Sequence, residues 1–169
     1  MRDWLATRAD GTPEATAVAA GGDVVTPRSY ADLNERVEVL AGRLAARGVG
    51  VDDALAVCAE TRIEFLEAVH AAQRLGAVLV PLNARLTADE LAVRLERIDP
   101  AAVACETDTE RAVTDAIEAV EANDTTILSF DEPTAGAERL ESVRPEPFDL
   151  PEWEPDHPLV VMFTSGTTG

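Results

Sequence analysis

The sequence predicts an α/β fold built on a parallel sheet of βαβ units. Short apolar runs alternate with segments of helical periodicity along most of the chain, which is typical of parallel strands joined by crossover helices. The strand-like runs are apolar at nearly every position, as expected of strands that helices cover on both faces. Apolar residues make up 46% of the 169 residues, which suffices for a core.

A short helix and a hairpin are predicted before this alternation begins. Trp4 and Leu5 are the apolar anchors of the helix, which ends at a Gly-Thr-Pro turn. Two β-type runs, 15–20 and 23–26, flank Gly21-Gly22, and such a glycine pair is typical of a tight hairpin turn.

Four longer helices are predicted from apolar residues that recur at helical spacing. Ser29, Thr61 and Thr87 are the expected N-caps of the first three, and Glu90 stands where a capping box requires it. The last helix is expected over residues 111–121. The apolar positions are Leu33, Val37, Leu40 and Leu44 in the first; Ile63, Phe65, Leu66, Val69 and Leu75 in the second; Leu91, Leu95 and Ile98 in the third; and Val113, Ile117 and Val120 in the last.

The strands between these helices are short. We expect them at residues 54–59, 77–82, 101–105 and 125–130. After the last of them, residues 131–158 carry six prolines and nine acidic residues. This composition favours an acidic surface connection, with one short helix near residues 137–142.

The charge composition predicts a folded protein with a strongly acidic surface. All 14 basic residues are arginines, against 32 acidic residues, so the formal charge is −18. This balance resembles that of cytoplasmic proteins of salt-accumulating halophiles, in which salt screens the self-repulsion of the compact state. It disfavours nucleic acid and anionic membrane surfaces as partners.

The two cysteines predict a reducing compartment. Cys58 and Cys105 each lie in an apolar run, and their spacing matches no zinc or redox motif. We therefore expect two reduced thiols in the core. The N-terminus lacks the apolar centre of a signal peptide, and no apolar run reaches membrane-spanning length. The expected location is cytoplasmic, without membrane insertion.

The last eleven residues combine a predicted strand with a loop of small residues. Residues 159–163 are all apolar and predict a short buried strand. The loop after it consists of Thr164, Ser165, Gly166, Thr167, Thr168 and Gly169. Backbone N–H groups and hydroxyls of this kind surround phosphate oxygens in proteins. The lysine of a Walker A loop is missing. The plainer interpretation is a polar terminus or a turn that caps a following helix.

This loop resembles the phosphate loop of adenylate-forming enzymes, the acyl-CoA synthetase and luciferase superfamily. The resemblance extends over the whole chain, through Ser29–Leu33, Gly48–Asp52 and Leu75–Thr87, with Asp53 in place of a glycine of that family. It implies an incomplete N-terminal AMP-binding domain. Its expected parts are an N-terminal helix and turn (1–14), βαβ units (15–130), the acidic connection (131–158), and the strand with the phosphate loop (159–169).

The resemblance implies an AMP-forming acid–thiol ligase. A carboxylic acid reacts with ATP to give an acyl adenylate, and coenzyme A then takes the acyl group. ATP, Mg²⁺ and coenzyme A are the implied substrates and cofactors, and the six loop residues, 164–169, are implied to bind the ATP phosphates. The implied adenine-binding, Mg²⁺-binding, acyl-pocket and catalytic lysine segments lie beyond Gly169. No catalytic residue or metal ligand is therefore expected within the chain, which is expected to be inactive alone.

The opening of the chain narrows the implied substrate. Asp3-Trp4-Leu5, Thr12-Pro13-Glu14 and Glu67–Ala71 resemble o-succinylbenzoate–CoA ligases of menaquinone biosynthesis. The alternatives are a medium- or long-chain fatty acyl-CoA synthetase, a non-catalytic nucleotide-binding remnant, and a nucleotide-binding protein of another α/β family. The acyl substrate and the oligomeric state stay open.

Four further polar residues receive a structural interpretation. His70 lies in mid-helix among apolar residues, so we expect it to pack partly buried rather than to act as a base. His157 precedes Pro158 in a turn and is expected to be solvated. Asn83 and Arg85 are expected to hold buried or shelf-forming polar positions without a catalytic role.

Overall fold

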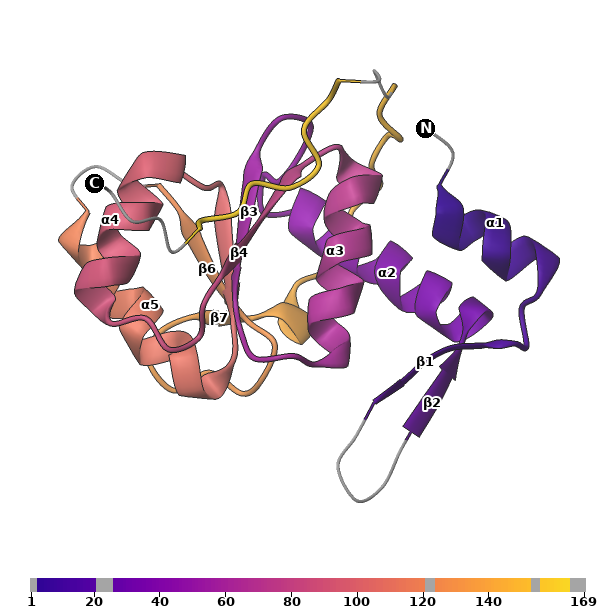
Figure 1. Cartoon of the computed structure of the whole chain (residues 1–169), viewed down its shortest axis with the longest axis horizontal. Coiled ribbons are helices and arrows are strands. Elements are labelled where there is room, and N and C mark those ends of the chain that lie inside the picture. The colour runs from indigo at the N-terminus through magenta and orange to yellow at the C-terminus, as the bar shows by residue number, and fades with distance from the viewer. Residues whose placement is uncertain (1–2, 21–25, 121–123, 153–155, 165–169) are drawn as a thin grey trace.

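The computed structural model describes residues 3–20, 26–120, 124–152 and 156–164, and these form the predicted α/β fold (Figure 1). An antiparallel hairpin is formed by β1 (Thr16–Ala20) and β2 (Thr26–Ser29). A five-stranded parallel sheet has the order β4-β3-β5-β6-β7. Its strands are β3 (Ala54–Cys58), β4 (Val78–Leu82), β5 (Ala102–Cys105), β6 (Thr126–Ser129) and β7 (Glu138–Arg139).

Helices cover both faces of this sheet (Figure 1). The pair α2 (Tyr30–Ala45) and α3 (Ile63–Leu75) lies on one face, and the pair α4 (Ala88–Ile98) and α5 (Thr107–Ala119) lies on the other. Strand residues consequently alternate between two apolar clusters. Leu55 and Val57 pack in the cluster of α2 and α3, whereas Ala56 and Cys58 pack in the cluster of α4 and α5. The continuous apolar runs of the sequence thus have the predicted cause.

The order in which strands are added to the sheet changes direction at β3: β4 lies on one side of it, and β5 lies on the other. β4 pairs with one edge of β3, and α4 then leads back so that β5 pairs with the other edge. In open α/β sheets the carboxyl ends of the two strands at such a reversal border a crevice, which is the usual place for a ligand.

Two of the three predicted helix caps are confirmed. Ser29 and Thr87 each accept a backbone N–H of their own helix and form capping boxes. The predicted cap at Thr61 is wrong, because α3 begins at Ile63 after Arg62, and Arg62 makes no side-chain cap hydrogen bond. Thr61 lies one position too early to reach the N–H groups that an N-cap side chain satisfies.

The strands of the large sheet lie within one residue of the predicted bounds, apart from β7, and three other elements differ more. β2 begins three residues later than expected and leads directly into the cap of α2, whereas the predicted turn at 21–22 lies outside the described residues. α5 begins four residues earlier, because Glu106 and Thr109 form a capping box. The predicted short helix near 137–142 is confirmed only over its last residues, as the 3₁₀ helix Leu140–Ser142, because the two-residue strand β7 precedes it.

The N-terminal helix α1 (Trp4–Gly11) is tied to the helix pair α2 and α3 by one buried arginine. The side chain of Arg74 in α3 is 4% exposed. Its guanidinium pairs with Asp3, the N-cap of α1, and with Glu38 and Asn34 of α2 at 2.7 to 2.9 Å. Three helices therefore share one cation.

Candidate functional site

Residues 156–164 run along the edge of the sheet beside β4 (Figure 1). The N–H of Leu79 donates to the carbonyl of Leu159 at 3.0 Å, and the N–H of Val161 donates to the carbonyl of Leu79 at 2.9 Å. These bonds make one parallel bridge between Val160 and Leu79. Farther on, the ring of Phe163 lies 5.7 Å from the guanidinium carbon of Arg94 in α4.

The predicted buried strand at 159–163 is wrong in its burial. Val160 and Val161 are each 43% exposed, and Met162 is 71% exposed. An edge segment is covered only where a further strand or helix packs on it. Phe163 is half-buried against the cluster of α4 and α5, whereas the middle of the segment, Val160 to Met162, is left exposed among the described residues. Of the loop, Thr164 is described and exposed. The positions of Ser165, Gly166, Thr167, Thr168 and Gly169 lie outside the described residues, so their role stays a prediction.

A groove of about 720 Å³ opens beside this segment. Val78 and Val80 of β4 form its apolar floor, and Ile98 of α4 contributes one wall. Arg97 and Thr164 add polar groups. A mostly apolar hollow with a few polar groups is the kind of surface that binds small organic molecules.

The start of the segment is anchored by His157. Its Nε2 lies 3.1 Å from the carbonyl oxygen of Gly76, and its Nδ1 lies 3.5 Å from a carboxylate oxygen of Asp52. The His157 side chain is only 14% exposed, so the prediction of a solvated ring is wrong. Gly76 ends α3 with φ of +74°, and a Cβ there would stand 3.0 Å from Cβ of Pro151. The connection before the segment therefore passes close over this glycine.

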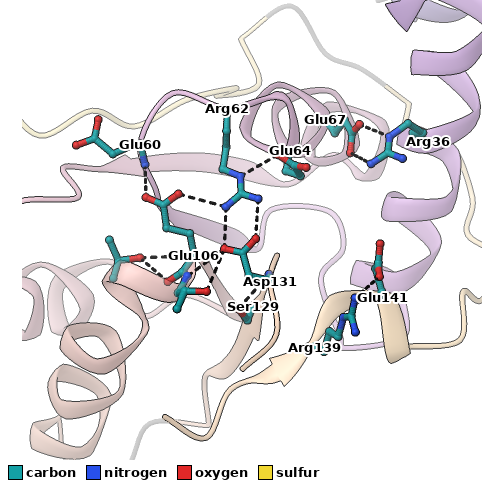
Figure 2. Close-up of polar contacts among 12 residues, drawn as sticks. Arg36, Glu60, Arg62, Glu64, Glu67, Glu106, Ser129, Asp131, Arg139 and Glu141 are labelled. Atoms are coloured by element: carbon teal, nitrogen blue, oxygen red, sulfur yellow. Dashed lines mark hydrogen bonds and ion pairs between the residues drawn. The ribbon is translucent and has the colours of Figure 1, made fainter. Parts of the chain in front are cut away.

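The carboxyl ends of β3, β5 and β6 carry a cluster of charged side chains around Arg62 (Figure 2). The two terminal nitrogens of Arg62 donate to Asp131 at 2.9 and 2.8 Å. One of them also donates to Glu106 at 3.2 Å, and Nε donates to Glu64 at 2.8 Å. The guanidinium lies 5.6 Å from the ring centroid of Phe130. One cation thus joins the segments that follow three different strands.

Backbone groups complete this cluster. Asp131 also accepts the N–H of Thr107, in the first turn of α5, at 3.1 Å. Chiefly because Arg62 donates to it, the pKa of Asp131 is lowered to about 2. Glu106 accepts the N–H of Glu60 at 2.7 Å, and the hydroxyl of Thr109 donates to the carbonyl of Cys58 at 2.6 Å. Polar groups at the carboxyl ends of β3 and β5 are therefore hydrogen-bonded to one another.

The sequence contained a signal for this cluster that composition and motif analysis missed. Arg62, Glu106 and Asp131 each follow within four residues of a predicted strand. Because parallel strands end at the same edge of a sheet, charged residues in these positions are brought together. The acidic composition by itself predicts only a strongly acidic surface.

A second buried carboxylate holds the chain after β6. Glu110 of α5 is 0% exposed. It accepts the N–H groups of Thr134, Ala135 and Ala137 at 2.7, 2.7 and 3.1 Å, and the hydroxyl of Thr134 at 3.0 Å. Burial opposes ionisation, but these hydrogen bonds outweigh it, so the pKa of Glu110 lies below its ordinary value.

The other candidate residues have structural roles. His70 is half-buried and stacks on Trp4 with 6.2 Å between ring centroids, and burial lowers its pKa. This confirms the packing role. Asn83 accepts the N–H of Arg85 at 3.0 Å in a local turn. Both are exposed, and the Arg85 side chain is 84% exposed, so the buried position predicted for them is wrong. The alternative, a shelf-forming polar position, stays a prediction.

The two cysteines are reduced and buried, as predicted. They stand side by side in the register of β3 and β5. Burial raises the pKa of Cys58 to about 11 and that of Cys105 to about 12. Both thiols therefore stay protonated at neutral pH and serve as small core residues.

Two further properties concern the described part of the chain. Within it, no group of three or more His, Cys, Asp or Glu side chains is arranged to hold a metal ion. None of its helices has the length and apolar character needed to cross a membrane.

Comparison with known proteins identifies the family. A family model described as "AMP-binding enzyme" matches residues 5–169. The chain belongs to the AMP-binding enzyme family. This confirms the predicted superfamily and excludes a nucleotide-binding protein of another α/β family.

Relatives in this family are longer than the chain. The 2-succinylbenzoate–CoA ligase of Bacillus cereus (strain Q1) is 34% identical over 169 residues, which are 100% of this chain and 31% of the relative. The o-succinylbenzoate CoA synthetase of Bacillus subtilis, solved in complex with AMP, matches with a TM-score of 0.78 at 28% identity, over 98% of this chain and 39% of that one. A fatty acyl CoA synthetase of Mycobacterium tuberculosis matches with a TM-score of 0.75 at 29% identity, over 96% of this chain and 32% of that one. The chain thus spans about a third of these AMP-binding enzymes.

Proposed function

We propose that this chain is the first part of the AMP-binding domain of an ATP-dependent carboxylic acid–CoA ligase, and that 2-succinylbenzoate is the acid. The supporting observation is the match to the family over residues 5–169, which includes the whole hydroxyl-rich loop. The names of whole-chain relatives at about 34% identity favour this acid. On this proposal the enzyme serves menaquinone biosynthesis.

The reaction has two steps. A carboxylate oxygen attacks the α-phosphorus of ATP, an oxygen–phosphorus bond forms, and pyrophosphate leaves, giving an acyl adenylate. The sulfur of coenzyme A then attacks the acyl carbon, a thioester forms, and AMP leaves. The thiol proton passes to solvent or to a base, so charge balances over the two steps. Phosphoryl and adenylyl transfer depend mainly on positioning and charge stabilisation.

The proposed task of residues 164–169 is to position the triphosphate. Hydroxyls of Ser165, Thr167 and Thr168 donate to β- and γ-phosphate oxygens, while Gly166 and Gly169 let the backbone approach closely. This loop carries no charge, and the chain has a formal charge of −18. On this proposal Mg²⁺ enters the site with the substrate, as Mg·ATP, and offsets the charge of the phosphates.

Pyrophosphate exchange tests this assignment. The protein translated from the complete reading frame that contains these residues is incubated with ATP, Mg²⁺, 2-succinylbenzoate and labelled pyrophosphate. We expect label to enter ATP only when the acid is present. Thr168→Ala should reduce this exchange about 10-fold or more, since hydrogen bonds to charged groups contribute about 1.5–3 kcal/mol.

Thr12→Ala is the matched control, because its hydroxyl only donates to the carbonyl of Arg8 at the end of α1. It should leave exchange unchanged. Acid-dependent exchange that survives Thr168→Ala at the control's level would contradict the role of the loop. Absence of exchange with every carboxylic acid would favour the non-catalytic nucleotide-binding remnant.

A fatty acid is the second candidate for the substrate. It is favoured by the fatty acyl CoA synthetase that matches this fold with a similar TM-score. The same exchange assay with hexanoate and palmitate in place of 2-succinylbenzoate separates the two. We further expect the 169-residue chain alone to show no exchange, because it spans only about a third of its relatives.

A further inference from the structure

The crevice between β3 and β5 is where an open α/β sheet usually holds a ligand. Here the guanidinium of Arg62 lies within hydrogen-bonding distance of three carboxylates, those of Glu64, Glu106 and Asp131. The excess of negative charge would repel a nucleotide triphosphate or another anion. The crevice is therefore closed to the ligands that such sheets most often bind there.

Asp131 lies between the guanidinium of Arg62 and the start of α5 (Figure 2). Its carboxylate receives both terminal nitrogens of Arg62 and the N–H of Thr107 in the first turn of α5. An arginine fork and the N-terminus of a helix are the donors that hold bound phosphates and carboxylates in other proteins. The side chain is supplied by the segment after β6, on the far side of β5.

We infer that Asp131 is a built-in anion: it takes the place of a ligand anion at the start of α5 and thereby locks together the segments that follow β3, β5 and β6. The lock has a defined shape, because the guanidinium is fixed from three sides by Glu64, Glu106 and the ring of Phe130. Removing the carboxylate would leave Arg62 and the Thr107 N–H pointing at a vacant position. An ordinary surface ion pair would leave side chains that relax into solvent instead.

Chemical rescue tests the inference. Asp131→Ala removes one carboxylate and keeps the β-carbon, so formate has the size of the missing group. The thermal unfolding midpoint of the 169-residue chain is measured in sodium formate and in sodium chloride at equal ionic strength, because the acidic chain also responds to salt in general. For Asp131→Ala we expect a saturable rise in formate over chloride, about 3–6 °C at a formate concentration tenfold above its dissociation constant.

Two variants and the unchanged chain serve as controls. Glu132→Ala removes the neighbouring carboxylate, which is 79% exposed and pairs with Arg139. Asp131→Asn fills the position with a neutral group of the same shape. Neither variant, nor the wild-type chain, should distinguish formate from chloride. Asp131→Asn should still have a lower midpoint than Glu132→Ala.

The response of Asp131→Ala to formate decides whether Asp131 fills an anion position. Equal responses of Asp131→Ala to both salts, or a formate response of Glu132→Ala as large as that of Asp131→Ala, would overturn the inference. If Asp131→Ala does not fold in dilute buffer, folding in formate and not in chloride supports it. Folding in both salts, or in neither, overturns it, because saturating formate should refill a preformed anion position.

Discussion

Replacing Glu110 with glutamine should destabilise the protein out of proportion to the size of the change. In the present structure one carboxylate oxygen accepts the N–H groups of Ala135 and Ala137, and the other accepts the N–H and the hydroxyl of Thr134. The side chain is 0% exposed, so water cannot replace a lost partner.

The magnitude follows from these contacts. The least costly amide orientation keeps the oxygen toward Ala135 and Ala137 and turns the NH₂ group toward Thr134, whose hydroxyl can rotate to accept. The N–H of Thr134 then faces a donor and is left unsatisfied, which costs about 1–3 kcal/mol. The two remaining bonds also lose the strength that a charged acceptor gives. We expect a total loss of about 2–4 kcal/mol in the free energy of unfolding.

Urea unfolding at pH 7 and fixed salt concentration measures this loss. Glu118→Gln is the control, because Glu118 lies on the same helix and is exposed. A loss within about 0.5 kcal/mol of the control would refute the reasoning, since it would mean that the chain after β6 is not held by this carboxylate.

Three other predictions follow from charges and close contacts. Gly76→Ala should lower the free energy of unfolding in urea by at least about 1 kcal/mol more than Gly48→Ala. Both glycines have positive φ, but only at Gly76 would the new Cβ meet Pro151. Equal losses would contradict the close packing. The lowered pKa of Asp131 should contribute about 1–2 kcal/mol of stability, a value discounted for the partial exposure of the side chain. This stability is present above pH 3.8 and is lost as the pH falls towards 2. Acid unfolding of Asp131→Asn should lack this part of the loss, and identical acid profiles of the variant and the unchanged chain would disprove the prediction. Raising KCl from about 0.1 M to about 2 M should raise the unfolding midpoint, since a formal charge of −18 is then screened; a steady fall of the midpoint by circular dichroism would show that lost ion pairs outweigh the relief.

The sequence predicted the layers of the fold because each depends on local pattern. Runs such as 54–59 are apolar throughout and lie between two helix layers, and caps such as Ser29 need only neighbours three residues away. The family was also within reach, since residues 164–169 and the block Leu75–Thr87 are contiguous motifs.

Features that depend on distant partners were mispredicted or missed. The burial of residues 159–163 depends on which elements pack over this segment beside β4. The pattern of apolar residues within the segment does not contain that information. His157 is half-buried because Gly76 and Asp52, far away in the chain, surround its ring. The position of Arg62 among three acids follows from strand order, which local pattern leaves open. The loop residues beyond Thr164 stay a prediction for the experiments above.

The buried Arg74 gives the absence of lysine a meaning for the interior. Its flat guanidinium presents nitrogens in three directions. It therefore donates to Asp3, the N-cap of α1, and at the same time to Glu38 and Asn34 of α2. An ammonium group has three donors as well, but they extend from one nitrogen on a flexible stem and lack the fixed planar fork with which the guanidinium reaches both helices. The exclusive use of arginine as the basic residue thus has a structural consequence at position 74, where the guanidinium holds α1 against α2 and α3.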